Sequence, residues 1–470
     1  MSEKQGHSVK GLPMFAEASP EALAKDKAQL AELEKLPTLE KWKGYWARTG
    51  PGWFQSAMTL GGGTAFASLF AGAFLGYKLL WLQPVSMFLG IIMLSAMSHQ
   101  SLSVGEKPFS AISRHIHPSI AWAWALGALI ANIIWHFPQY ALCSAMIADI
   151  ISAITRWDPG ATAHGILLLV IGICILFVAT WISWNYAKGK KGIKLVERII
   201  KWNIWIIIFC FAAVVIRQSF AGEVAWGKVF LGFIPFSYIP REHVGVSIMI
   251  AGFSAAVGIN MTFLFGYSYL AKGWGKEHRG IAKFDLVTGM WIPYTLATGL
   301  MIIAAACTIH GSAEFDGTKI SPIQAASMLQ GAGIPLFLSR VIFGLGIAGM
   351  TFNAINMQML TSGFAACEMF NVEPGGWKYK LACMIPAPGF LGVVLWKYMG
   401  SWIAIPTSAI CGLMLPIAYI SFFLLNNKKE YLGKDMPKGG LRFWWNLGML
   451  TAIGISIVSV VYYLYNIFGK

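Results

Sequence analysis

The sequence predicts an all-α membrane protein with eleven transmembrane helices, and three observations support this fold class. Of the 470 residues, 56% are hydrophobic and only 12% are charged. Apolar runs recur along the chain, and many reach the roughly 20 residues that a helix needs to cross a bilayer. Two of these runs, half a chain apart, are interrupted by glycine-containing stretches near their centres. Broken helices of this kind mark the binding site in many secondary transporters.

A polar tail, residues 1–48, precedes the predicted transmembrane domain, residues 49–470. Ser19-Pro20-Glu21 reads as a helix start, because serine caps a helix and proline fits its first turn. We expect a short interfacial or cytosol-facing helix here, in a solvated rather than a regulatory tail. The predicted spans are 51–76 (broken), 79–103, 119–152, 162–183, 197–217, 244–270 (broken), 284–309, 334–370, 381–397, 402–425 and 441–467.

The first span is interrupted by Thr59-Leu60-Gly61-Gly62-Gly63-Thr64. Each glycine costs roughly 1 kcal/mol of helix propensity relative to alanine. Broken backbone at membrane depth is tolerated only where it is buried in protein or lines a polar cavity. We therefore expect Gly61–Gly63 to form an unwound joint between two half-helices. The alternative is that these glycines only allow close helix packing.

The sixth span carries the second interruption, residues 254–260, which includes Gly258. Spans 1–5 and 6–10 would then form two halves of five helices, each opening with a broken helix, and span 11 follows them. The first span begins inside and the sixth outside, so the two halves have inverted topology. In such inverted repeats the binding site lies near the midplane, between the two joints.

The charged residues predict the orientation of the chain. Most of the 36 lysines and arginines lie in the tail and in alternate loops, which the positive-inside rule places in the cytoplasm. This gives a multi-pass protein of a cell membrane, inner or plasma, with a cytoplasmic N-terminus and an outside C-terminus. The net charge of +15 is then expected to meet anionic lipid and not nucleic acid. We expect no cleavable signal peptide, because the polar tail has no apolar core.

No enzyme signature is found. The chain has neither a phosphate loop of the Gly-x-x-x-x-Gly-Lys type nor a His-Glu-x-x-His motif. Its seven cysteines lie in or at the ends of apolar segments and form no Cys-x-x-Cys pair, so we expect neither disulfides nor zinc. The prediction is a protein that is not an enzyme and that uses no cofactor.

The predicted site is uncharged. The only acidic residues inside apolar segments lie near the ends of those segments, and they are Asp149, Asp285 and Glu368. A metal ion would therefore depend on carbonyl oxygens of the Gly61 and Gly258 regions and on side-chain oxygens of Thr59, Thr64 and Asn260. Such a site suits an ion that keeps its water, as Mg²⁺ does most readily. Free N–H groups at the start of the second half-helix would instead favour an anion or carboxylate.

Spans 3 and 8 add polar residues to the candidate site. His136 and Gln139 are three residues apart and share a helix face. An ionisable group in a membrane is functional by default, although His136 could equally be a satisfied core histidine. In span 8, Asn353 and Asn356 are one helical turn apart, where they could line a pore or hold helices together.

Two stretches carry a resemblance to a known family. Gly50-Pro51-Gly52-Trp53 at the start of span 1 and residues 74–81 at its end resemble the Nramp (natural resistance-associated macrophage protein) family of divalent metal-ion transporters. The charged turn after span 6 and the long span 8 are similar to that family as well. The resemblance implies a LeuT-type fold, with eleven helices in a 5+5 inverted repeat, and alternating access to the two sides of the membrane.

The residues that bind metal in the family are replaced in this chain. The family's Asp-Pro-Gly-Asn in span 1 falls on Gly61, Gly62, Gly63 and Thr64, and its Met-Pro-His in span 6 falls on Gly258, Ile259 and Asn260. A further histidine falls on Phe265, and the acidic residues of span 3 that are linked to proton movement fall near Phe137 and Tyr140. The chain thus resembles a divergent Nramp-related branch that lacks the usual metal-site residues.

These observations predict a secondary-type transporter that moves a divalent cation, such as partly hydrated Mg²⁺ or Mn²⁺, with weak or no proton coupling. Coupling should be weak because His136 is the sole deep residue that titrates near neutral pH. One alternative is a LeuT-type transporter of a small organic solute, such as an amino acid or carboxylate. Another is a non-transporting membrane sensor. The expected partners are the transported ion or solute and the lipid bilayer, and the oligomeric state stays open.

Overall fold

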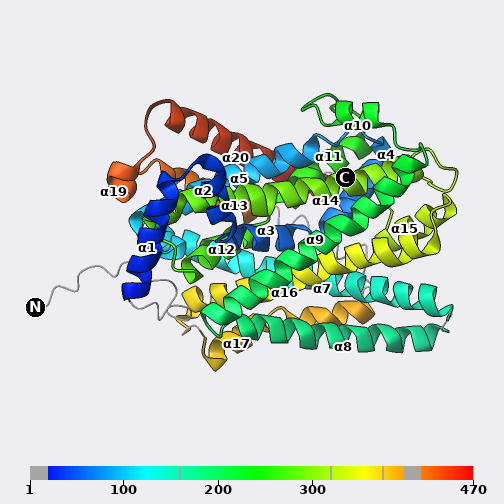
Figure 1. Ribbon diagram of the computed structural model, residues 1–470, viewed down its shortest axis with the longest axis horizontal. Coiled ribbons are helices and arrows are strands. Elements are labelled where there is room, and N and C mark those ends of the chain that lie inside the picture. The colour runs from blue at the N-terminus through cyan, green and yellow to red at the C-terminus, as the bar shows by residue number, and fades with distance from the viewer. Residues whose placement is uncertain (1–19, 158–159, 318–319, 373–374, 396–413, 469–470) are drawn as a thin grey trace, which may run out of the picture.

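The computed structural model describes residues 20–157, 160–317, 320–372, 375–395 and 414–468. Most of these residues are helical, and the long helices run side by side along the longest axis of the molecule (Figure 1). Within these ranges nine helices are long and apolar enough to cross a membrane, or ten when one bent pair counts as a span. The predicted tenth span lies largely outside the described residues, and its described part is the helix Met414–Asn426.

The crossing helices follow the predicted spans. They are α3 (Pro51–Thr59) with α4 (Gly62–Leu75), α5 (Leu82–Val104), α7 (Pro118–Thr155), α8 (Ala161–Tyr186), α9 (Lys190–Phe220), α11 (His243–Ala256) with α12 (Ile259–Ala271), α13 (Arg279–Leu286) through η2 (Val287–Trp291) to α14 (Ile292–Thr308), η3 (Phe337–Ile342) with α16 (Phe343–Phe370), α17 (Trp377–Cys383) with η4 (Ala387–Leu391), and α20 (Gly439–Phe468). Shorter helices connect them: α6 (Pro108–His115), α10 (Trp226–Gly232), α15 (Pro322–Gly331) and α19 (Lys429–Leu432).

The first break is shorter than predicted. The axes of α3 and α4 meet at 60°, and only Leu60 and Gly61 lie between the two helices. Gly62 and Gly63 already belong to the first turn of α4, where backbone N–H groups have no intrahelical partner in any case. The packing alternative also holds at this point, because a Cβ on Gly63 would lie 2.9 Å from the Trp135 ring.

The second break is also two residues long, but it bends its span less than the first. Val257 and Gly258 are extended and separate α11 from α12. Four crossing helices, α5, α7, α8 and α9, lie between the first broken pair and the second, so the two pairs cross the bundle in opposite directions. The inverted arrangement of two broken helices is thereby confirmed.

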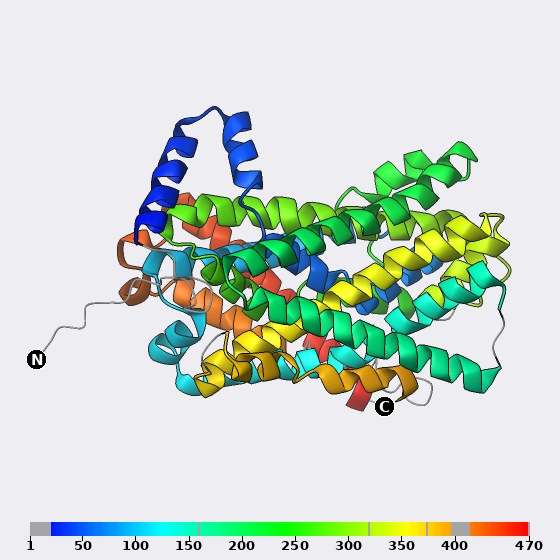
Figure 2. The same cartoon turned by 60° about the horizontal axis from the view of Figure 1, so that its bottom comes forward.

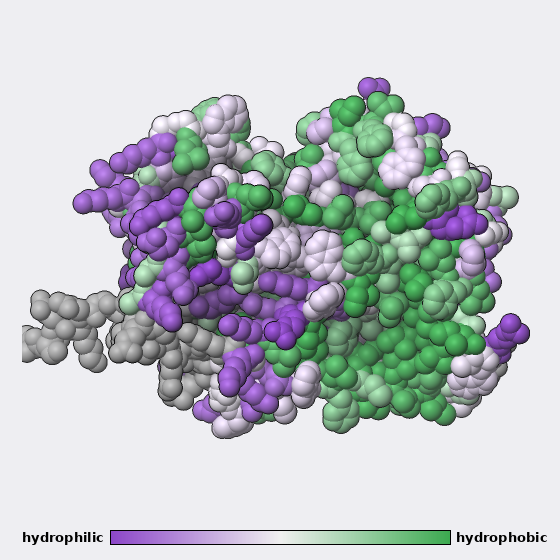
Figure 3. Space-filling model, in the orientation of Figure 1, coloured by the Kyte–Doolittle hydropathy of each residue, from purple (hydrophilic) through white to green (hydrophobic). Residues whose placement is uncertain are grey.

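The surface separates into an apolar flank and a polar end. Figure 3 shows apolar side chains over the lower flank, where α8 lies, and polar side chains gathered around the end of the bundle near α1 (Pro20–Lys35). Large side chains of α8 such as Phe177 and Trp181 are exposed. An exposed apolar flank of this extent fits against lipid tails. The helices can cross lipid because their backbone N–H and C=O groups are satisfied within each helix.

The tail is not merely solvated. Residues 20–46 form two helices, α1 and α2 (Thr38–Trp46), which make a hairpin beside the polar end of the bundle (Figure 2). Leu30 of α1 and Tyr45 of α2 are buried, and Lys27 forms an ion pair of 3.2 Å with Glu277. The two tail helices therefore pack against the body of the protein. The first nineteen residues of the predicted tail lie outside the described ranges.

Replacement of Gly72 by valine is expected to prevent folding. A Cβ at Gly72 would lie 2.4 Å from the carbonyl oxygen of Ile302, so α4 could not approach α14 as it does. Overpacking usually costs about 1–3 kcal/mol, and backbone cannot yield as a side chain can. The yield of monodisperse protein on size-exclusion chromatography tests this. Gly165→Val on α8, where a Cβ would meet open space, is the matched control and should leave the yield unchanged.

Candidate functional site

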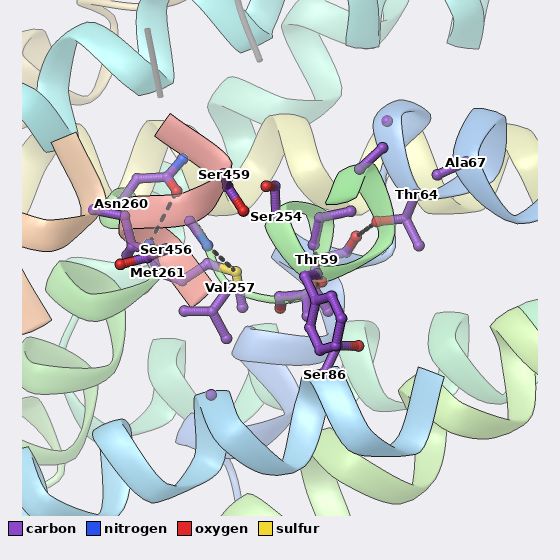
Figure 4. A pocket seen from close by; sticks show the side chains of 18 of the residues that line it. Thr59, Thr64, Ala67, Ser86, Ser254, Val257, Asn260, Met261, Ser456 and Ser459 are labelled. Carbon is purple, nitrogen blue, oxygen red and sulfur yellow. Dashed lines mark hydrogen bonds between the residues drawn. The ribbon is translucent and has the colours of Figure 1, made fainter. Parts of the chain in front are cut away.

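A cavity of about 160 Å³ lies at the centre of the bundle, against both helix breaks (Figure 4). Its wall is built by α3, α4, α5, α7, α11, α12, α16, the helix Met414–Asn426 and α20. Among the residues that the structure describes, no Asp, Glu, Lys, Arg or His lines it. The described chain also holds no group of three or more His, Cys, Asp or Glu side chains that could bind a metal ion.

Thr59 ties the two breaks together. Its hydroxyl lies 3.0 Å from the carbonyl oxygens of both Ala255 and Ala256, to which it donates across 196 and 197 residues of sequence. The hydroxyl of Thr64, one turn into α4, donates back to the Thr59 carbonyl. Both threonines line the cavity, as predicted from the sequence, and together they fix how the first joint sits against the second.

Gln139 of α7 supports the first joint from the other side. Its Oε1 accepts a hydrogen bond of 2.9 Å from the backbone N–H of Gly62, one of the N–H groups that open α4. A Cβ at Gly61 would come within 2.8 Å of Gln139 Nε2, so glycine is needed for this approach. Gln139 also lines the cavity, and it therefore both shapes the joint and contributes an amide to the wall.

Asn260 is held at the second joint by two hydrogen bonds. Its Nδ2 donates to Oδ1 of Asn132 at 2.9 Å, and its Oδ1 accepts from the Met261 N–H at 3.0 Å. Asn132 in turn donates to the hydroxyl of Ser362 on α16 at 3.1 Å. Asn132 was not among the predicted site residues, although its place one helical turn before His136 was a usable signal.

The carbonyl groups proposed as ion ligands each make one backbone bond. The Gly61 oxygen accepts from Ala65 at 3.0 Å and the Gly258 oxygen from Met261 at 3.1 Å. A carbonyl oxygen has two lone pairs, so each keeps acceptor capacity. The Met261 sulfur accepts from the Gly258 N–H at 3.3 Å. Neutral oxygen acceptors thus dominate the polar part of the wall.

Four predicted site residues do not line the cavity, and they are Gly62, His136, Asn353 and Asn356. Buried His136 bonds through Nδ1 to Oε1 of Gln358 at 2.7 Å, and it is Gln358 that lines the cavity. Asn353 accepts from Asn203 of α9 at 2.7 Å, and Asn356 donates to its own helix at Phe352. For Asn356 the reason is its position around α16, because residues 356 and 358 are about 200° apart at 100° per residue and Gln358 is the one that faces the cavity.

Several lining residues were missed in the sequence. Figure 4 shows serines that point toward the cavity from three helices, and these are Ser86 of α5, Ser254 of α11, and Ser456 and Ser459 of α20. Tyr463 of α20 joins them. Positions 456, 459 and 463 follow helical spacing, so a polar stripe on the last span was visible in the sequence. This stripe indicated a polar face of the last span, but not that the face would line the cavity.

The cavity lies on the far side of the joints from the N-terminus, because α3 fills the near side. All nine residues of α3 are buried. The N–H groups of Gly50 and Gly52 donate to the two carboxylate oxygens of fully buried Asp285, at 3.0 and 2.7 Å. Beside them Lys272 and Glu197 form an ion pair of 2.6 Å. Asp285, which the sequence placed only near the end of a span, fastens α3 to α13.

A helical bundle with two inverted broken helices around a central cavity is the fold of the LeuT-type transporters. A manganese transporter of Eremococcus coleocola matches with a TM-score of 0.72 and 15% identity, over 91% of this chain and 89% of that one. MhsT, solved with L-phenylalanine, matches with a TM-score of 0.59 and 16% identity, over 87% and 98% of the two chains. At these identities the likeness shows the fold.

The chain belongs to the Nramp family. The family model described as "Natural resistance-associated macrophage protein-like" matches residues 52–466. The NRAMP-like transporter smf-2 of Caenorhabditis elegans is 31% identical over 153 residues, which are 31% of this chain and 26% of that protein. The aligned stretch thus spans about a quarter of that relative. The family inferred from stretches at the two ends of the first span is thereby confirmed.

Proposed function

We propose that this protein is a membrane transporter that moves a divalent cation, Mg²⁺ or Mn²⁺, in partly hydrated form. The observation that carries the proposal is the uncharged, oxygen-lined cavity between two helix breaks in a chain of the Nramp family. The similar structure from Eremococcus coleocola is described as a manganese transporter, which supports a divalent ion as the cargo.

The chemistry of the wall favours an ion that keeps part of its water. The free energy needed to remove water from a divalent cation is normally offset by binding to carboxylates or, for softer metals, to sulfur and imidazole. Here the described wall has no carboxylate or imidazole, and its sulfur atoms are the thioethers of Met58 and Met261, the second of which already accepts a hydrogen bond. A cavity of about 160 Å³ has room for several waters. Water bound to the cation can donate to the hydroxyl and carbonyl oxygens of the wall.

The second candidate is a transporter of a small organic solute. The observation that favours it is the apolar part of the same wall, where the aromatic side chains Trp135, Phe253 and Tyr419 line the cavity together with residues of the first turn of α4. A helix N-terminus attracts a carboxylate, and aromatic rings suit an apolar body. Pockets for small molecules commonly combine an apolar wall with a few polar groups.

Uptake into proteoliposomes separates the two candidates. We expect flux of Mg²⁺ or Mn²⁺ that saturates with ion concentration and is absent from protein-free vesicles. Failure to move Mg²⁺, Mn²⁺, Fe²⁺ and Co²⁺ would contradict the ion proposal. Thermal stabilisation of the protein by an amino acid or carboxylate, but by none of these ions, would support the organic solute instead.

Transport is expected to be weakly coupled or uncoupled to protons. A proton path needs a chain of titratable groups, and His136, the deep histidine, bonds only to an uncharged amide through Nδ1. Its Nε2 has no hydrogen-bond partner among the described residues. A pH-sensitive dye inside the vesicles should therefore report little acidification during ion uptake. Stoichiometric acidification that His136→Ala abolishes, and that the exposed control His117→Ala preserves, would overturn this expectation.

A further inference from the structure

The helix that precedes the first span exposes one apolar face. Leu39, Trp42 and Trp46 of α2 are 66%, 52% and 45% exposed. They occupy positions i, i+3 and i+7, which lie on one side of a helix. We name these three residues the α2 tryptophan face. Two exposed tryptophans and a leucine side by side are unusual on a surface that meets only water, and such patches mark an interaction site.

Contacts on an adjoining side of α2, about 60° around the helix from Trp42, fix the orientation of this face. Tyr45 is buried, its ring lies 5.6 Å from that of Phe284 on α13, and its hydroxyl donates to Glu34 of α1. The Trp42 ring touches Phe284 at its edge, with centroids 6.2 Å apart. The helix is therefore held against the body of the protein while the α2 tryptophan face points outward.

The α2 tryptophan face is joined by ring contacts, by way of buried Trp53, to a helix that meets lipid. The rings of Trp46 and Trp53 are 5.6 Å apart, those of Trp53 and Trp205 are 6.1 Å apart, and Trp205 is followed by Phe209 at 6.1 Å. Trp202 and Phe209 are both 66% exposed on α9, a crossing helix. This row of rings leads from the outer flank of a span directly to α2.

The level of α2 relative to the bilayer follows from α9. The N-terminal part of α9 is basic, and its last lysine, Lys201, donates to the Thr49 carbonyl at 2.6 Å. Apolar residues begin directly after it with Trp202. The change from basic to apolar residues marks the boundary between water and hydrocarbon, where tryptophan is enriched. The end of α2 thus lies at the height of the lipid headgroups.

We propose that the α2 tryptophan face binds the bilayer interface on the N-terminal side of the protein, with both indoles among the lipid headgroups. The occupant is lipid, because the face lies at headgroup height, is joined by ring contacts to a helix whose outer flank meets lipid, and has the composition of an interfacial amphipathic helix. Only residues 47–50 separate α2 from α3. The lipid contact would therefore hold the start of α3, the half-helix that closes the near side of the cavity.

Photo-crosslinking of the full-length protein in nanodiscs that hold one copy tests this proposal. Benzoylphenylalanine replaces Trp42 or Trp46, and the matched control replaces exposed Glu40, which lies about 200° from Trp42 around the helix. We expect lipid adducts at positions 42 and 46 to exceed those at position 40 several-fold by intact mass. Equal lipid labelling at the three positions, or adducts to protein alone, would overturn the proposal.

A second measurement guards against damage from the substitutions. Hydrogen exchange of α2 in the unmodified protein should be slower in nanodiscs than in lipid-free amphipol. In the double variant Trp42→Ser with Trp46→Ser this difference should disappear, while exchange in buried α3 stays unchanged. An α2 that exchanges equally fast with and without lipid, in protein of intact α3, would exclude the lipid contact.

Discussion

Asp285→Ala should destabilise the protein by about 2–6 kcal/mol and release the half-helix α3 from its seat, because it leaves two buried N–H groups, those of Gly50 and Gly52, without an acceptor. Each unsatisfied buried group costs roughly 1–3 kcal/mol. The carboxylate also sits at the N-terminus of α3, where the helix dipole favours negative charge.

Two measurements check the Asp285 prediction. The unfolding temperature should fall by several degrees, and a cysteine reagent applied from the N-terminal side should reach a cysteine placed at buried Ala57 faster than in the parent. Glu430→Ala is the matched control, since the Glu430 side chain is 84% exposed and its ion pair with Lys428 is long, at 3.8 Å. Unchanged stability together with unchanged access to position 57 would contradict the role assigned to Asp285.

Gln139→Ala should lower the initial rate of substrate uptake by about fivefold to a hundredfold. The substitution removes the acceptor of the Gly62 N–H and an amide from the cavity wall. A lost partner costs about 1–3 kcal/mol, and each 1.4 kcal/mol is a factor of ten in an equilibrium constant. The loss falls on the joint that lines the proposed cargo site. Rates are compared at equal amounts of reconstituted protein.

The control for Gln139 lies on the same helix. Ser144 of α7 is buried and does not line the cavity, and its hydroxyl has no partner among the described residues. Ser144→Ala should therefore transport at nearly the parental rate. If Gln139→Ala also kept that rate, the first joint would not be part of the cargo site.

The sequence allowed the spans and both joints to be predicted because their signals are local. Glycine is a poor helix former wherever it occurs, and apolar length is counted along the chain. The exact end of the first break was not predictable in this way, since Gly62 and Gly63 are tolerated as the opening turn of α4 and not as unwound chain. Propensity alone does not distinguish a glycine between two helices from one in a first turn.

Contacts between distant segments account for what the sequence did not show. Asp285 meets Gly50 across 235 residues, and its place near a span end gave no sign of that partner. His136 has a helical spacing that suits a cavity, but packing against Gln358 turns it away. Docking of the tail depends on Tyr45 meeting Phe284, which again only the tertiary structure reveals.

The last helix has a consequence for how the protein is made. Ser456, Ser459 and Tyr463 of α20 line the cavity, and no other described lining residue follows them in the chain. The ribosome therefore adds this part of the wall after both joints and the α7 amide have been synthesised. A nascent chain halted before position 456 would have both broken helices in the bilayer but one side of the cavity open to lipid. Quality control that senses such an exposed polar cleft would act on chains whose α20 has not yet been inserted.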